Sequence, residues 1–371
     1  MGLFWRCKTV FMLLCVVSVL VGCGRAVIPC TDPTDNPECR ATLDEIMARA
    51  HVPAVSVVVL QNFRVVEQWA VGTASMDLNR SISVTTPFQA GDLSMPVTAL
   101  GVLAWLQDSG GHLDLVVNEG LADWQIADRR GWSGNAVTLR DLLSHRHGLS
   151  PTSFRGYAVG EMPPTWSEML TGQGAANSAP VLLASQPGEN CDYSAAGYEV
   201  LAYWLEQQSD WTFASWQNIA VFTPLNIPAR YQLIGLPSPA LGHDWRGKVI
   251  PGGFRRYHEH AAKGLWATPT DLARIVLEVM ATVRGQGRII TDPDLVSALL
   301  SPQGCRWGLG WSVERRGSET EFSLRGSTAG YRTFVLGQTR SGNGVVVMAN
   351  GDRGDRVIEK VVAAVRRDYG W

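Results

Sequence analysis

Short runs of β-branched residues lie near both ends of this chain, and they constrain its fold more than any other feature. Residues 54–60 and 65–71 are such runs, and the connection through 61–64 predicts a hairpin. The intervening region, roughly 95–300, has helical and loop patterns. Strand patterns return near the C-terminus, over residues 309–314, 331–336 and 345–349.

This order predicts an α+β body in which strands from both chain ends share one antiparallel sheet, with the helical region inserted between them. Helices are also predicted over residues 41–50 and 355–367. The chain has 371 residues, of which 46% are hydrophobic, so it can bury a large core. No internal repeat is present.

The N-terminus has the pattern of an export signal. Arg6 and Lys8 precede an apolar run over 10–21, which is short for a membrane span. The run ends in Leu-Val-Gly before Cys23, which resembles a bacterial lipobox. We therefore expect a signal peptide over 1–22, a lipidated Cys23, a tether over 23–40 and a folded domain over 41–371.

These features predict an exported lipoprotein that is anchored in a membrane and faces the periplasm. Gly24 follows the lipidated position, in place of the Asp associated with inner-membrane retention, so in a Gram-negative host we expect the outer membrane. Cys30 and Cys39 bracket a turn-rich loop, and we expect them to form a disulfide in this oxidising compartment. Cys191 and Cys305 are either a second bridge or two buried thiols.

Charge and histidine content point away from two other classes. The formal net charge of −2 gives no reason to expect nucleic acid as a partner. Two His-x-His pairs occur, but nothing indicates the three or four converging ligands of a metal site. We expect neither a metal nor a cofactor. The pairs are His145 with His147, and His258 with His260.

A small-residue turn over 88–94 leads into an apolar, helix-period segment over 97–106. The N-terminus of a buried helix that opens onto a cleft favours developing negative charge, because its free N–H groups and dipole face that charge. This is a natural place for a nucleophile. The residues available there are Asp92 and Ser94.

The stretch resembles the nucleophile segment of the serine β-lactamase and penicillin-binding protein superfamily, in its class C and esterase-like branch. The family pattern is Phe-x-x-Gly-Ser-x-Ser-Lys-Pro-x-Thr-Ala, in which the first Ser is the nucleophile and the Lys activates it. This chain has Asp92 at the Ser position and Met95 at the Lys position. No other Ser-x-x-Lys occurs in the chain.

Two further stretches, 137–150 and 264–274, also match the family in order, and the resemblance covers roughly 41–371. It implies a cleft between the sheet and the helical region. In the second stretch, Thr270 or Asp271 is expected to cap the following helix.

The other catalytic positions implied by the resemblance are only partly kept. Tyr193 is retained, but Ala195 stands in place of the substrate-holding Asn. Tyr193 is either a packed ring with a structural hydrogen bond or a proton-transfer group. Leu324 stands in place of the cationic or polar residue of the cleft strand. Gly326 and Ser327 retain the backbone half of an oxyanion hole.

We therefore expect a non-catalytic homologue with a binding or scaffolding role in the cell envelope, whose partner is a cell-wall peptide or an envelope protein. The candidates for binding in the cleft are Asp92, Ser94, Tyr193, Arg325 and Ser327. Arg325 either binds a carboxylate or faces solvent, and the second interpretation is favoured. Asp92 is expected to sit at the helix N-terminus, with its carboxylate at the old oxyanion position.

Two alternatives remain open. One is an active β-lactamase, D-alanyl carboxypeptidase or esterase that uses Asp92 or Ser94 as an unusual nucleophile. The other is a structural envelope protein whose cleft is filled.

Overall fold

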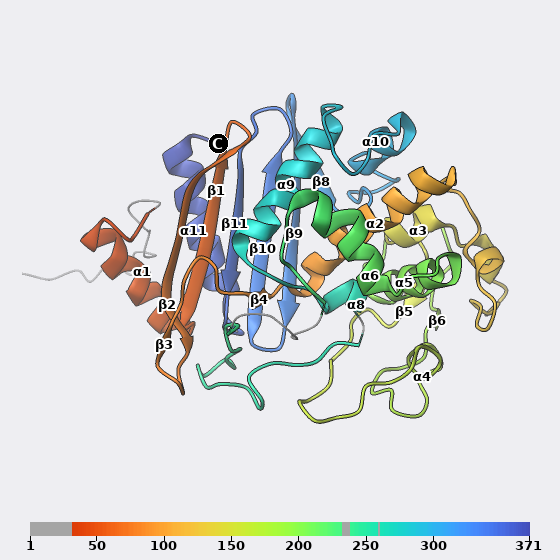
Figure 1. Cartoon of the computed structure of the whole chain (residues 1–371), viewed down its shortest axis with the longest axis horizontal. Coiled ribbons are helices and arrows are strands. Elements are labelled where there is room, and N and C mark those ends of the chain that lie inside the picture. Colours follow the sequence, from red (N-terminus) through yellow and green to blue (C-terminus); the bar gives the residue numbers. More distant parts are fainter. Residues whose placement is uncertain (1–31, 232–237, 259) are drawn as a thin grey trace, which may run out of the picture.

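The computed structural model describes residues 32–231, 238–258 and 260–371. Its centre is a seven-stranded antiparallel sheet with the strand order β3-β2-β1-β11-β10-β9-β8 (Figure 1). Strands from the two ends of the chain therefore lie side by side, as the sequence predicts. Their bounds are β1 Ala54–Gln61, β2 Arg64–Ser75, β3 Arg80–Ser81, β8 Ser312–Arg316, β9 Glu319–Thr328, β10 Tyr331–Gln338 and β11 Gly344–Ala349.

Pairing of β1 with β11 joins the two chain ends, with Val57 opposite Val347. The predicted hairpin of β1 and β2 is confirmed, and Asn62 and Phe63 form its turn with positive φ angles. Strand β8 begins at Ser312, three residues later than predicted, because Gly310 adopts a left-handed conformation that interrupts the extended chain.

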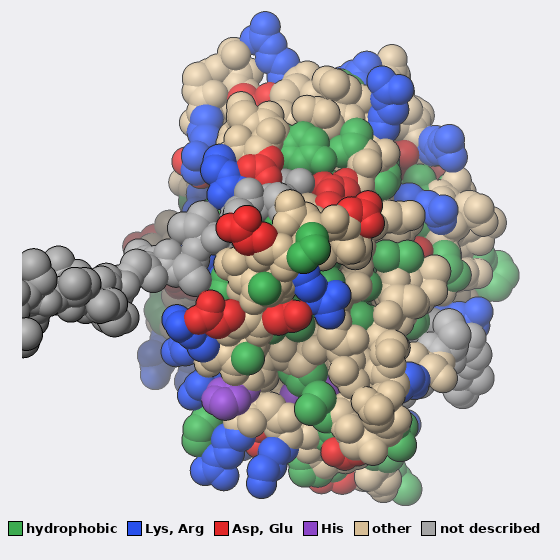
Figure 2. Space-filling model, turned by 90° about the vertical axis from the view of Figure 1, so that its left-hand side faces the viewer, with side chains coloured by type: hydrophobic (Ala, Val, Ile, Leu, Met, Phe, Trp, Pro, Cys, Tyr) green, Lys and Arg blue, Asp and Glu red, His purple; other side chains and the backbone are tan. Residues whose placement is uncertain are grey.

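Helices cover both faces of the sheet (Figure 1). α1 (Pro37–Ala50) and α11 (Asp355–Tyr369) pack on one face, where they enclose a small apolar core. The helical region packs on the other face and encloses a much larger core. Strand β1 is buried along nearly all its length, because both faces are covered. Figure 2 shows the side of the molecule where α1 lies, with positive and negative side chains interspersed.

The folded part begins earlier than the predicted boundary at residue 41. Asn36 caps α1 by accepting the N–H groups of Glu38 and Cys39, and Pro37 occupies the first helical turn. Cys39 is buried in this helix. Its predicted partner Cys30, the lipidation site Cys23 and the signal peptide over 1–22 lie outside the described residues. In the described ranges, no helix is long and apolar enough to cross a membrane.

The helical region is organised around α2 (Ser94–Ser109), which is buried over most of its length. α9 (Pro269–Val283) is capped by Thr268, not by Thr270 or Asp271 as predicted, and Asp271 completes a capping box from inside the helix.

The remaining elements are short. Four short strands form two small two-stranded ribbons: β4 Phe88–Gln89 with β7 Trp266–Ala267, and β5 Leu149–Ser150 with β6 Leu182–Leu183. The other α-helices are α3 Leu139–Leu143, α4 Trp166–Thr171, α5 Ala196–Gln208, α6 Phe213–Gln217, α7 Thr223–Leu225, α8 His260–Lys263 and α10 Pro293–Leu299.

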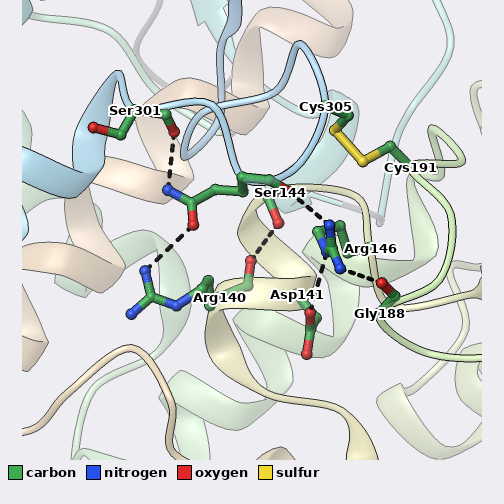
Figure 3. Close-up of a disulfide and its surroundings, with 9 residues drawn as sticks. Arg140, Asp141, Ser144, Arg146, Gly188, Cys191, Ser301 and Cys305 are labelled. Atoms are coloured by element: carbon green, nitrogen blue, oxygen red, sulfur yellow. Dashed lines mark hydrogen bonds and ion pairs between the residues drawn. A yellow bond between two sulfur atoms is a disulfide. The ribbon is translucent and has the colours of Figure 1, made fainter.

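A disulfide joins Cys191 to Cys305, with a Cα–Cα distance of 6.4 Å (Figure 3). Of the two states that the sequence leaves open, the bridge is the one present. Arg146 reinforces the same junction, because its guanidinium donates to the carbonyl oxygens of Gly188 and Gln303. The loop before α5 is thereby clamped to the loop after α10.

Replacing both Cys191 and Cys305 by Ser is expected to lower the free energy of unfolding by about 2–5 kcal/mol, because the bridge closes a loop of 114 residues. Urea denaturation of the double variant and of the oxidised parent measures the difference. Equal midpoints would contradict a structural role for this bridge.

Candidate active site

Two glycines let the start of the helical region lie directly against strand β9. Gly91 has a φ of +60°, and a Cβ there would come within 2.7 Å of the Ser327 nitrogen. At Gly326, a Cβ would lie 2.3 Å from the Ala90 carbonyl oxygen. A side chain at either position would therefore push the two backbones apart. This close approach places Asp92, in the 3-10 turn η1 (Gly91–Leu93), beside the cleft strand.

The Asp92 carboxylate is buried and accepts hydrogen bonds from three donors. The backbone N–H of Ser327 donates to Oδ2 at 2.8 Å. The Lys263 ammonium donates to Oδ1 at 2.8 Å, and the Tyr193 hydroxyl donates to the same oxygen. The carboxylate therefore accepts a hydrogen bond from the backbone N–H of Ser327, the group that the family resemblance assigns to an oxyanion hole.

Lys263 is the residue that the sequence analysis missed. Its side chain is only 4% exposed, and its ammonium also donates to the Ser327 carbonyl oxygen at 2.9 Å. It comes from α8, which is fixed from two sides. Thr98 of α2 donates to the Ala261 carbonyl oxygen at 2.9 Å, and the Ala262 N–H donates to the Glu199 carboxylate of α5 at 2.7 Å.

Tyr193 acts as a hydrogen-bond donor in this arrangement. Burial raises the pKa of its hydroxyl well above the ordinary value of about 10, and the neighbouring Asp92 charge raises it further. The hydroxyl therefore stays protonated at physiological pH. Of the two roles considered for Tyr193, the structural hydrogen bond is the one that this geometry supports.

The other altered family positions are part of the protein interior. Met95, Ala195 and Leu324 are all buried and belong to the larger hydrophobic core. Ser94 is also fully buried, and its hydroxyl donates to the Gly91 carbonyl oxygen at 2.7 Å while accepting the Leu265 N–H at 3.1 Å. Ser94 thus holds backbone segments together and does not face the cleft.

Arg325, for which the sequence left cleft binding and solvent exposure open, lies on the opposite face of the sheet with its side chain half exposed. Its guanidinium is 3.3 Å from the Asp355 carboxylate of α11 and packs over the Phe334 ring. The physical reason is strand alternation: Leu324 and Gly326 face the core, so the side chain between them faces the other way.

An open cavity of about 520 Å³ adjoins Lys263 and Ser327. Its lining carries charges of both signs. Arg155 and Arg255 come from two different loops and Arg332 from strand β10, and Glu161 and Asp352 line the same cavity. Tyr257 and Phe154 supply aromatic surface. The open cavity therefore reaches Lys263 of the buried ion pair, and Asp92 stands behind this lysine at the position where the family has its nucleophile.

The histidine pairs do not form a metal centre. His145 and His147 are buried behind Tyr193, and burial lowers the pKa of both imidazoles to about 3. His258 and His260 line a separate aromatic cavity. Among the residues that the structure describes, no group of three or more His, Cys, Asp or Glu side chains is placed to hold a metal ion.

A signal for Lys263 was present in the sequence. It is flanked by Ala261, Ala262, Gly264 and Leu265, so a charged residue stands in a small, apolar stretch. Such a lysine is almost never buried without a partner. The Ser-x-x-Lys motif does not include Lys263, because that motif requires the lysine to follow the nucleophile in the same helix.

Asp92→Asn is expected to lower the free energy of unfolding by about 3 kcal/mol, because it leaves the buried Lys263 ammonium without a counter-charge. Lys263→Met is expected to destabilise similarly, by stranding the carboxylate. The double variant should recover much of the loss. Chemical denaturation of all four proteins gives the coupling energy. Strictly additive losses would contradict a direct pair.

Comparisons with known proteins identify the family and the fold of this chain. A profile of the family described as Beta-lactamase matches residues 39–366. Penicillin-binding protein 4* of Bacillus subtilis (strain 168) is 26% identical over 198 residues. That match spans 49% of this chain and 39% of the relative, well under two thirds of the relative's length.

Among solved structures, a D-amino acid amidase from Ochrobactrum anthropi SV3 is similar with a TM-score of 0.70 and 17% identity, over 88% of this chain and 98% of that one. The octameric penicillin-binding protein homologue from Pyrococcus abyssi gives a TM-score of 0.69 and 19% identity, over 89% and 76%. These likenesses confirm the fold, and the profile confirms the resemblance seen in the motifs. The chain belongs to the beta-lactamase family.

Proposed function

We propose that this protein is a non-catalytic member of its family, exported and lipid-anchored, that binds a cell-wall peptide or an envelope protein through the old catalytic cleft. One observation carries the proposal: at the nucleophile position, the Asp92 carboxylate is saturated by Lys263, Tyr193 and the Ser327 N–H. The side chain at the nucleophile position, the neighbouring lysine and tyrosine, and the expected oxyanion-hole N–H are hydrogen-bonded to one another instead of to a substrate.

Loss of the serine alone costs a serine hydrolase on the order of 10⁶ in turnover, as measured in another enzyme. In this protein the neighbouring side chains that could assist catalysis are also hydrogen-bonded to Asp92. The cation that lies nearest to position 92 neutralises a carboxylate, and Tyr193 cannot accept a proton while it donates to Asp92. These facts support the absence of turnover.

The competing hydrolase hypothesis needs Asp92 or Ser94 as nucleophile. Both oxygens of Asp92 are hydrogen-bonded, and its side chain is 8% exposed. Ser94 is buried between backbone groups. Neither residue meets the requirement of an exposed nucleophile beside a free base.

The hypothesis of a purely structural protein requires a filled cleft. The cavity of about 520 Å³ beside Ser327 is instead open, and its size is typical of sites for small ligands. This favours binding over a purely structural role.

Because neither candidate nucleophile is free, we expect no covalent labelling by a fluorescent penicillin or by a fluorophosphonate. In-gel fluorescence after incubation, followed by peptide mapping, is the measurement, with an active serine β-lactamase as the positive control. An adduct on a cleft residue that disappears when that residue is substituted would refute the non-catalytic assignment.

Binding is tested separately with a synthetic cell-wall pentapeptide that ends in D-alanyl-D-alanine. Ala329 lines the cavity, so Ala329→Trp should fill it and reduce peptide affinity at least about tenfold. Isothermal titration calorimetry measures the affinities, and Ala363→Trp on the exposed side of α11 serves as the matched control. Equal affinities in the two variants would exclude the cleft as the peptide site.

A further inference from the structure

Three surface segments, residues 76–80, 155–163 and 238–258, lie together along the lower edge of the molecule in Figure 1. We refer to them as the rim segments. Each carries large apolar side chains that are at least half exposed to solvent. These are Met76 at 55%, Leu78 at 68%, Val159 at 51%, Met162 at 79% and Trp245 at 50%.

Contacts between the rim segments make them one surface. The Met76 N–H points to the His243 imidazole at 3.4 Å, which joins the first segment to the third. Gly252 lies against Val159, since a Cβ there would come within 2.8 Å of the valine Cγ2. The exposed apolar side chains therefore belong to one edge of the molecule, and several large exposed apolar side chains on one edge point to an interaction surface.

Positive charge accompanies this apolar surface. The rim segments contain six Lys and Arg residues against three Asp and Glu residues, in a chain whose formal net charge is −2. The Arg246 guanidinium stacks over the exposed Trp245 ring at 4.3 Å, and Lys248 is exposed on the same loop. Figure 2 shows Lys, Arg and hydrophobic side chains near one another at the lower edge.

We infer that the rim segments dock onto the surface of an anionic phospholipid bilayer. Exposed Trp, Leu and Met side chains beside Lys and Arg are the composition of interfacial membrane binding, in which apolar groups enter the headgroup region and cations contact anionic lipid. The inference rests on the proposed lipid anchor for its biological setting. The 14 residues from Cys23 to Asn36 span up to about 45 Å when extended, which lets this edge reach the membrane.

Docking through the rim segments determines that the cavity beside Lys263 and Ser327 opens toward the membrane. Arg155 and Glu161 line the open cavity, while Val159 and Met162 of the same loop are exposed beside it. The cavity mouth is thus held next to the bilayer surface. A ligand would enter from the membrane side, past a mixed charged lining in which Arg155 and Arg255 stand beside Glu161.

The test uses the mature chain from residue 23 with Cys23→Ser, so that docking is separated from acylation. Co-sedimentation with vesicles of phosphatidylethanolamine and phosphatidylglycerol is compared with vesicles of phosphatidylcholine alone. We expect at least about tenfold tighter binding to the anionic vesicles, which weakens as salt is raised. Leu78→Ser/Met162→Ser and Arg246→Glu/Lys248→Glu should each lower this binding at least about tenfold.

Matched controls carry the same kinds of change elsewhere. Trp211→Ser/Ile219→Ser removes two large apolar side chains that are 50% and 44% exposed, and Arg315→Glu/Arg340→Glu reverses exposed charges outside the rim segments. Both should bind like the parent. Lack of vesicle binding by the parent, or equal losses in the control and rim variants, would overturn the inference and leave the proposed anchor and cleft function untouched.

Discussion

The buried ion pair between Asp92 and Lys263 ties together the parts of this molecule that meet at the cleft. Asp92 lies just before α2, Lys263 ends α8, and both bond to the backbone of β9. Tyr193, from the loop before α5, reaches the same carboxylate. A buried pair adds little net stability over apolar packing, but loss of one member is costly because a charge is left without compensation. The pair therefore contributes more to fixing how these elements are arranged than to the net free energy of folding.

The backbone of the site keeps the family arrangement although the side chains at several motif positions differ from the family pattern. Gly91 and Gly326 allow the close approach of the turn before α2 to strand β9. The N–H of Ser327 still points at the side chain of residue 92, although it now bonds a resident carboxylate. Function in this family lies in a few side chains on a tolerant scaffold.

Much of the fold could be predicted from sequence because its signals are local. Strand runs at both ends and the Asn62–Phe63 turn follow from residue patterns. The candidate site was only partly predictable. Residues in the family motifs could be placed in advance, but Lys263 enters from an element 171 residues away from Asp92. For Arg325 the motif alone left cleft binding and solvent exposure open, and the alternation along β9 places its side chain on the face away from the cleft.

The Asp92–Lys263 pair also bears on how this lineage can change. If Asp92 alone is replaced by serine, the Lys263 ammonium remains in the interior without its counter-charge. If Lys263 alone is lost, the carboxylate is left in the same condition. Each single substitution is therefore expected to destabilise the fold more than the two together, which makes the two positions epistatic. Evolutionary change at one position of the buried pair depends on which residue stands at the other.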